Sequence, residues 1–191
     1  NGVQSSTDPN PNLTFTNPSN TGNSTFIVEH IVSNGFACSD TVIDTLIVYP
    51  KPQAQFTLPS NACAPASITV TNNSQAKAPA SYLWTVSSSA VGISNPNGLA
   101  PTFSFPDNQS GIDSTYTITL IVTSDDGCLD TTSQSITIYS RPLAGFTVID
   151  TLCGPVLLGV NDQAMGNGLT YSWSINPNAP IINGASAKPT G

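Results

Sequence analysis

Cysteine is the residue type in this sequence that is best suited to chemistry. The 191 residues contain four cysteines, Cys38, Cys63, Cys128 and Cys153, and a single histidine, His30. A metal centre needs clustered ligands, and no Cys-x-x-Cys motif occurs here. Disulfide bonding is therefore the chemistry that the cysteines predict, and it is typical of proteins exported to oxidising compartments. Four cysteines allow three pairings, so the connectivity depends on how the chain is organised.

His30 and the acidic residues are the remaining candidates for a catalytic or metal site. The sequence near His30 offers no Ser or Cys nucleophile with a third, orienting group, so a triad is not supported. We expect His30 to lie partly buried at the rim of a core strand. Asp125, Asp126 and Asp130 surround one loop and carry the oxygen ligands that Ca²⁺ prefers, but a solvated turn is the stronger expectation because only Asp130 has an acidic equivalent, Asp40. The prediction is a protein that is not an enzyme and has no cofactor, with Ca²⁺ as the one remaining candidate.

Charge and composition exclude two further classes. The chain has 4 basic and 11 acidic side chains and a net charge of −7, so nucleic acid would be repelled. No run approaches the roughly 18 consecutive apolar residues of a transmembrane helix, so we expect no membrane insertion in this segment. Strong helix formers such as Glu and Met are scarce, whereas Thr, Ser, Asn, Gly and Pro abound. An all-β protein is the predicted class.

The sequence repeats itself with a period of about 90 residues. Cys38 and Cys128 are separated by 90 positions, as are Cys63 and Cys153. The flanking segments have the same spacing or one position less: Tyr49-Pro50-Lys51-Pro52 with Tyr139-Ser140-Arg141-Pro142, and Tyr82-Leu83-Trp84 with Tyr171-Ser172-Trp173. A repeat of this length indicates tandem structural units.

The repeat divides the chain into three parts. We expect the back part of one unit in 1–52, a complete unit in 53–142 and the front part of a third unit in 143–191. Near the start, Thr14-Phe15 matches Thr102-Phe103 at a spacing of 88. The two incomplete parts together correspond to about one unit. The chain is therefore expected to be a segment of a longer protein, in which neighbouring chains or flanking sequence complete each split unit by strand pairing.

Each unit is expected to be a two-sheet sandwich. Apolar residues alternate with threonines in the run from Tyr116 to Val122, so that one face of the strand is apolar. About seven such short strands, separated by Pro, Asn, Ser and Gly clusters, are typical of a sandwich. The side chains expected in its core are Phe56, Ile68, Val70, Trp84, Tyr116, Ile118, Leu120, Val122, Ile136 and Ile138.

The order of these anchors resembles a known family. It reads Ala-x-Phe, Cys-x-Pro, Ile-x-Val, Tyr-x-Trp, Tyr-x-Ile-x-Leu-x-Val and Gly-Cys-x-Asp-Thr, from Phe56 to Asp130. The chain thus resembles PKD (polycystic kidney disease) domains, which are immunoglobulin-like sandwiches. More narrowly, it is similar to the cysteine-bearing PKD repeats of very long surface proteins that gliding bacteria export through the type IX system. The acidic, Gly-rich loop that follows the Trp in many PKD domains is replaced after Trp84 by Thr85-Val86-Ser87-Ser88-Ser89, so no role of that loop is carried over.

This organisation leaves two disulfide patterns open. The first choice is Cys63 with Cys128, because both lie in the complete unit, with Cys38 and Cys153 bonded to partners outside the fragment. Cys63 precedes the second strand and Cys128 follows the sixth, however, an order that favours opposite ends of a simple sandwich. The alternative is Cys38 with Cys63 and Cys128 with Cys153, which would link neighbouring units.

Aromatic and hydroxyl side chains suggest two kinds of surface role. Trp84 and Trp173 could stack on carbohydrate, but a Trp on the third strand of a sandwich usually fills the core, and core is what we expect. Short Asp-Thr and Asp-Ser motifs resemble the O-glycosylation signal of the same bacterial group. The candidate sites for glycosylation are Thr41, Thr45, Ser114, Thr131 and Thr151.

Together these patterns predict an extracellular structural repeat at the cell surface. Short linkers that contain proline would make tandem sandwiches a semi-rigid rod. The leading hypothesis is a spacer or filament segment of a giant cell-surface adhesin or appendage, and its role would be to present an adhesive tip. Its expected partners are neighbouring repeats of the same protein, and further copies in a homo-oligomer or fibre bundle. The alternative is a module that binds glycans or a surface protein in cell attachment, through loops 87–100 and 174–188.

Overall fold

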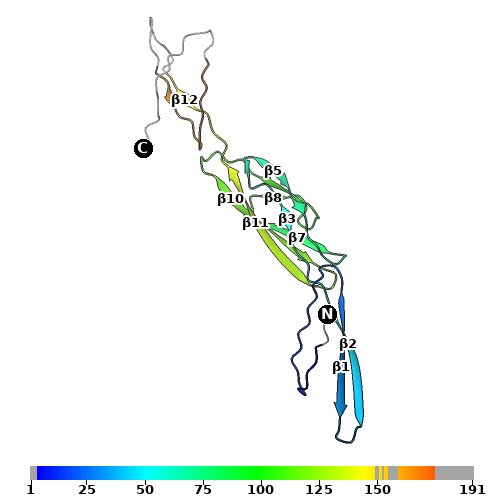
Figure 1. The fold of residues 1–191 in the computed structure, drawn as a ribbon. Helices are drawn as coiled ribbons and strands as arrows, with labels where there is room; N and C mark the ends of the chain where they lie inside the picture. The colour runs from blue at the N-terminus through cyan, green and yellow to red at the C-terminus, as the bar shows by residue number, and fades with distance from the viewer. Residues whose placement is uncertain (1–3, 149–150, 152, 155–158, 175–191) are drawn as a thin grey trace.

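The computed structural model describes residues 4–148, 151, 153–154 and 159–174, and every regular element among them is a strand (Figure 1). The expected all-β class is confirmed. In the described part of the chain, no helix has the length and apolar character needed to cross a bilayer. The strands are β1 (Ser24–Ser33), β2 (Ser39–Val48), β3 (Phe56–Thr57), β4 (Asn61–Cys63), β5 (Ala66–Thr69), β6 (Thr71–Asn72), β7 (Ser81–Val86), β8 (Gly92–Ile93), β9 (Thr102–Phe105), β10 (Ser114–Thr123), β11 (Leu129–Tyr139), β12 (Phe146–Thr147) and β13 (Asn161–Asp162).

Residues 53–142, called the central unit below, form two larger sheets and one two-stranded sheet. One sheet has the order β4-β11-β10-β7, and the other has the order β5-β9-β8, with β3 and β6 paired separately. β10 pairs with both of its neighbours in antiparallel fashion, whereas β4 lies parallel to the end of β11. The alternation of apolar residues and threonines in β10 explains why one face of this sheet is buried and the other faces solvent.

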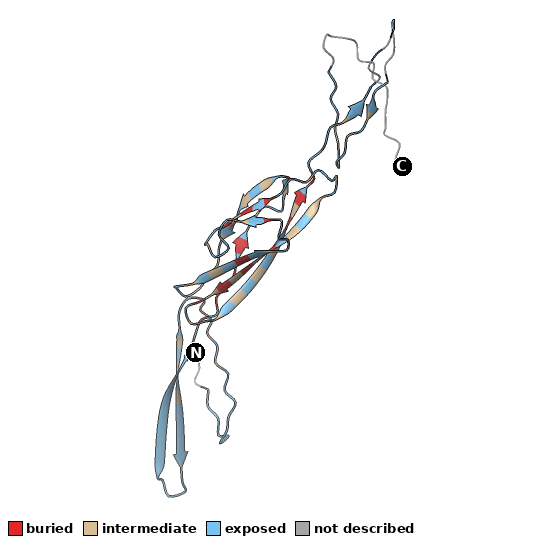
Figure 2. Cartoon of the chain, turned by 180° about the vertical axis from the view of Figure 1, so that it is seen from behind, coloured by how far each residue is buried: buried red, intermediate tan, exposed pale blue. Residues whose placement is uncertain are grey.

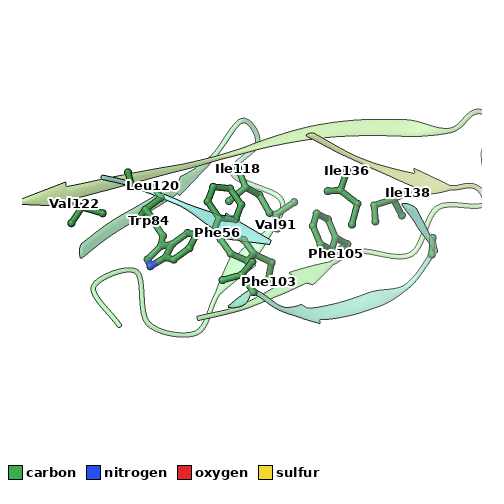
Figure 3. Packing of buried hydrophobic residues seen from close by; sticks show 13 residues of the cluster. Phe56, Trp84, Val91, Phe103, Phe105, Ile118, Leu120, Val122, Ile136 and Ile138 are labelled. Atoms are coloured by element: carbon green, nitrogen blue, oxygen red, sulfur yellow. The ribbon is translucent and has the colours of Figure 1, made fainter. Parts of the chain in front are cut away.

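A single apolar core lies between these sheets (Figure 3). Phe103 and Phe105 from one sheet face Ile118, Ile136 and neighbouring side chains from the other. Of the expected core residues, two are partly buried against the cluster, Ile68 and Tyr116, and the others are buried: Phe56, Val70, Trp84, Ile118, Leu120, Val122, Ile136 and Ile138. The central unit is therefore sandwich-like, with its core where alternation places it.

The strand pairing recurs at a spacing of 90 residues. β1 and β2 pair from Ser24↔Val48 to Ser33↔Ser39, and β10 and β11 repeat this register 90 positions later, from Ser114↔Ile138 to Thr123↔Leu129. The β3–β6 pair returns as β12–β13 in the same way. The bridge between Gln53 and Gln75 returns as the bridge between Leu143 and Met165. Equivalent sequence positions therefore have equivalent pairing partners.

One sequence alignment has to be corrected. The rings of Phe15 and Phe26 lie 5.1 Å apart, and those of Phe105 and Tyr116 lie 5.2 Å apart. Phe15 is therefore equivalent to Phe105, at a spacing of 90, and not to Phe103 at 88. Thr-Phe is a match of only two residues, and the same strand carries a second phenylalanine, Phe105, two positions after Phe103.

The parts on either side of the central unit expose the side chains that the central unit buries (Figure 2). The β1–β2 hairpin extends away from the central unit and is exposed over nearly its full length. In the C-terminal part, Phe146 is 56% exposed and Trp173 is 44% exposed, whereas their central equivalents Phe56 and Trp84 are 0% and 1% exposed. The apolar side chains in the described residues of both outer parts are therefore largely exposed.

Candidate functional site: the joints and the open halves

The joint between β2 and the central unit is held by the carboxylate of Asp130. Its Oδ2 accepts a hydrogen bond from the backbone N–H of Ala54 at 2.9 Å, and its Oδ1 lies 3.1 Å from Lys51 Nζ. The hydrogen bond from Ala54 and the nearby Lys51 ammonium lower the pKa of Asp130 below its usual value. Asp130 lies near the start of β11, so one side chain ties the linker to the main sheet.

A second set of contacts packs the end of β2 against a loop of the central unit. Lys77 Nζ lies 2.8 Å from Asp126 Oδ2 and 5.5 Å from the centre of the Tyr49 ring. The hydrogen bond to Asp126 raises the pKa of Lys77. Pro50 and Pro52 are fully buried. Because proline also fixes φ, the linker has few conformations available to it.

The joint after β11 is held by a different set of polar contacts. The backbone N–H of Ser140 donates to Asp113 Oδ1 at 2.9 Å, and that of Arg141 donates to the carbonyl of Asn108 at 2.7 Å. The Arg141 guanidinium pairs with Asp107 at 2.8 Å. Both joints therefore anchor the linker backbone to the central unit, at opposite ends of β11.

The fold does not bring together Cys63 and Cys128, the preferred disulfide pair. In this structure none of the four cysteines is bonded to another. Cys63 is the parallel partner of Tyr139 at the end of β11, and Cys128 directly precedes its start. A strand of 11 residues spans about 35 Å, whereas a disulfide needs Cα atoms within about 7 Å. The two cysteines therefore lie at opposite ends of the central unit.

The candidate calcium ligands have other partners. Asp126 pairs with Lys77, and Asp130 with Lys51 and Ala54, while Asp125 is exposed. Over the described ranges, no group of three His, Cys, Asp or Glu side chains is arranged to hold a metal ion. What sequence reasoning missed was the structural role of Asp130, although its recurrence as Asp40, each 11 positions before a basic linker residue (Arg141 and Lys51), was a usable signal.

The remaining candidate residues are distributed over surfaces. Thr41, Thr45, Thr131 and Thr151 are exposed, and Ser114 is half-buried. His30 was expected to lie partly buried at the rim of a core strand, but it is exposed on β1. Among the described residues, β1 pairs only with β2, and no second sheet covers it. Loop 87–100 contains β8 and packs back on the unit, since the carbonyl of Gly98 accepts a hydrogen bond from Trp84 Nε1 at 2.9 Å. Of loop 174–188, only residue 174 belongs to the described part of the chain.

The C-terminal part contains an open groove of about 510 Å³ beside exposed aromatic side chains. Phe146 and Trp173 line it, with ring centres 5.2 Å apart at an interplanar angle of 75°, and Tyr171 lies next to them. The central pair Phe56 and Trp84 has nearly the same geometry, 5.0 Å and 75°. The aromatic pair that lines the groove is therefore arranged like the buried pair in the core of the central unit.

Comparison with known protein families and with curated proteins returns no match. Among solved structures, the PKD1 domain of Vibrio anguillarum Epp is 23% identical over 49% of this chain and 100% of that domain, with a TM-score of 0.35. The PKD1 domain from the Vibrio cholerae metalloprotease PrtV is 29% identical over 46% of this chain and 96% of that domain, with a TM-score of 0.32. A nucleoside hydrolase-related hypothetical protein from Saccharophagus degradans, associated with carbohydrate metabolism, is 17% identical over 49% of this chain and 26% of its own, with a TM-score of 0.37. Two of these three are PKD domains, the class that the sequence resembles.

Proposed function

We propose that this chain is an extracellular structural repeat, a spacer or filament segment of a giant cell-surface adhesin or appendage. The observation that carries the proposal is the clamped joint, in which Asp130 ties the linker residues Lys51 and Ala54 to the main sheet. A flexible linker would let each unit tumble separately. A linker with buried prolines and a bound backbone keeps successive units in line, as a spacer requires.

A tandem array with a period of about 90 residues is part of the proposal. The support is the recurrence of strand register, bridges and aromatic pairs at that spacing on both sides of the central unit. Repeated units whose contacts are mainly with their neighbours form quasi-linear assemblies. Length would then scale with the number of repeats, without a new fold for each.

The strand order suits a load along the chain. β4 near the start of the unit lies parallel to the end of β11, which leads into the next joint. Pulling the two linkers apart would draw β4 and β11 in opposite directions along their shared ladder. The hydrogen bonds of that ladder, including Thr137 N–H to Ser60 O at 3.0 Å and Ala64 N–H to Tyr139 O at 2.9 Å, would then resist together.

The proposal includes a cellular setting. The resemblance to cysteine-bearing PKD repeats implies export by the type IX system and display on the surface of a gliding bacterium. Low charge and hydroxyl-rich strand faces suit an exported surface protein, on which the exposed Thr41, Thr45, Thr131 and Thr151 are available for O-glycosylation. Mass spectrometry of peptides from the native protein tests these positions, and Ser114, directly.

Small-angle X-ray scattering of the dilute full chain tests the spacer role. The expected result for the wild type is an extended particle. Asp130→Ala, which releases the linker, should give a shorter longest dimension and a broader distribution of that dimension. Asp125→Ala is the matched control, because Asp125 is exposed. Identical scattering from the wild type and Asp130→Ala would show that the clamp does not set the shape, and the spacer proposal would lose its main support.

A glycan-binding module is the second candidate, and the exposed Tyr171 and Trp173 in the groove favour it. Aromatic faces bind sugars by stacking. Titration of the full chain with surface glycans, followed by tryptophan fluorescence, separates the two functions. Saturable binding that is lost in Trp173→Ala would favour the binding module over the spacer.

A further inference from the structure

We propose that the peptide bond between Lys77 and Ala78 is a gated cleavage site for an endoprotease that cuts after basic residues. The gate is the pair of contacts that hold the Lys77 side chain, one to the carboxylate of Asp126 and one to the ring of Tyr49. This inference goes beyond the spacer role, because it assigns a modification site and the class of enzyme that acts on it. The residues that carry it lie in the central unit and its first joint.

Basic residues are rare in this sequence, and all but one of them precede a proline. The four dipeptides are Lys51-Pro52, Lys77-Ala78, Arg141-Pro142 and Lys188-Pro189. Proline makes up 16 of the 191 residues, so this arrangement is far above the frequency that chance would give. An endoprotease that binds Lys or Arg in its specificity pocket cuts the following bond poorly when proline comes next, because proline has no N–H and a fixed φ. The bond after Lys77 is therefore the one that such an enzyme can cut.

The basic side chains that are most exposed are the ones that proline protects. The side chain of Lys51 is 72% exposed and that of Arg141 is 48% exposed, although each forms an ion pair at a joint. The side chain of Lys77, which no proline follows, is 27% exposed. Exposed connections are the positions at which proteases commonly cut a folded chain. Each basic residue in the described part of the chain is thus protected, either by a following proline or by the contacts of its side chain.

The side chain of Lys77 is held on two sides. Its Nζ donates to both carboxylate oxygens of Asp126, at 3.0 Å to Oδ1 and 2.8 Å to Oδ2. The side chain of Asp126 is 12% exposed, and partial burial strengthens an ion pair relative to one in water. The Tyr49 ring, whose centre lies 5.5 Å from Nζ, adds a cation–π contact from the residue that follows β2. A protease must withdraw the ammonium from both partners before its specificity pocket can bind it.

The backbone around this bond is otherwise accessible to a protease. Residues 77–79 form a bend between β6 and β7 and belong to no strand, and Ala78 and Pro79 are exposed. A protease binds its substrate as an extended segment, so a bond outside the strand ladders needs little local unfolding before it is cut. The barrier to cleavage therefore lies mainly in the side-chain contacts of Lys77.

The proposed reaction is the hydrolysis of one peptide bond. The bond between the Lys77 carbonyl carbon and the Ala78 nitrogen breaks. The oxygen of one water joins the carbon to give a carboxylate, and the two hydrogens of that water end on the nitrogen, which becomes an ammonium. The cut interrupts the chain between β6 and β7, so that in a spacer non-covalent contacts alone would join the two sides. This consequence rests on the proposed function, whereas the cleavage itself does not.

Limited digestion of the folded full chain with trypsin tests the gate. The wild type should be cut slowly, and Asp126→Ala should be cut after Lys77 about tenfold faster, because a hydrogen bond between charged groups contributes roughly that factor to the closed state. Tyr49→Ala should be cut faster by a smaller factor, through loss of the cation–π contact. Mass spectrometry identifies the bond from the fragments 1–77 and 78–191. A wild type that is cut as fast as Asp126→Ala would overturn the proposal, and a Tyr49→Ala rate equal to that of the wild type would remove the joint from the gate.

A core variant separates opening of the gate from loss of stability. Ile136→Val removes one methylene from a fully buried side chain of β11 and leaves Asp126 and Tyr49 in place. If the bond is cut by local opening, the rate of cleavage after Lys77 should stay close to that of the wild type. Urea denaturation of both variants measures how far each is destabilised. Equal acceleration in Ile136→Val and Asp126→Ala, at equal loss of stability, would show that the unfolded chain is the substrate and would refute the gate.

Arg141 provides the matched control for the role of proline. Asp107→Ala releases Arg141 from its ion pair, as Asp126→Ala releases Lys77, but Pro142 follows Arg141 and the bond should stay uncut. Combining Asp107→Ala with Pro142→Ala should allow cleavage after Arg141. Cleavage at this bond in Asp107→Ala alone, or its absence in the double variant, would contradict protection by proline.

Discussion

Asp130 accepts a hydrogen bond from the backbone of Ala54 at 2.9 Å, although the two residues are 76 positions apart in the chain. The contact links the first residues of the central unit to the start of its last long strand. It also brings the Lys51 ammonium to the same carboxylate. One side chain therefore stabilises both the unit and the joint that precedes it.

Removing this carboxylate should destabilise the central unit. In Asp130→Ala, the N–H of Ala54 loses its acceptor and Lys51 loses its ion-pair partner, so we expect a loss of about 1–2 kcal/mol in the free energy of unfolding. Urea denaturation followed by tryptophan fluorescence measures it. Asp125→Ala should change the unfolding free energy by less than about 0.5 kcal/mol, and equal losses in both variants would contradict a specific role for Asp130.

The same carboxylate should make stability depend on pH in the acid range. Because the pKa of Asp130 is lowered in the folded state from its ordinary value of 3.8, the ionised form contributes stability that is fully present above 3.8. This stability is lost as the pH falls through the lowered value. Asp130→Asn should remove this part of the acid dependence. Unfolding curves at a series of pH values below 5 measure the effect, and parallel curves for both proteins would argue against it.

Trp84 should be important for both its volume and its polar atom. The indole packs against Phe56 and Phe103, and its Nε1 donates to the carbonyl of Gly98 at 2.9 Å. Trp84→Ala should cost about 3–5 kcal/mol, and Trp84→Phe should cost less because a ring remains. Thermal unfolding by circular dichroism compares them with Trp173→Ala, which should leave the melting temperature of the dilute central unit nearly unchanged.

Much of the fold follows from local patterns in the sequence. The alternation in β10 and the motifs Tyr-x-Trp and Gly-Cys-x-Asp-Thr each involve residues that are close in the chain. The strands and most core residues could therefore be predicted. The cysteine pairing could not, because it depends on which end of β11 each thiol occupies, and that is set by the parallel pairing of β4 with β11. The partner of Asp130 could not be predicted for the same reason, since Ala54 is 76 positions away in the chain.

His30 and Leu120 occupy equivalent positions on β1 and β10, but His30 is exposed whereas Leu120 is fully buried. Leu120→Ala should therefore lower the free energy of unfolding by about 2–5 kcal/mol, because it leaves a cavity in the core of the central unit. His30→Ala should change the free energy of unfolding by less than about 0.5 kcal/mol, because the imidazole lies outside that core. Urea denaturation followed by tryptophan fluorescence compares the two variants. Equal losses in both would contradict the difference in burial between the two strands.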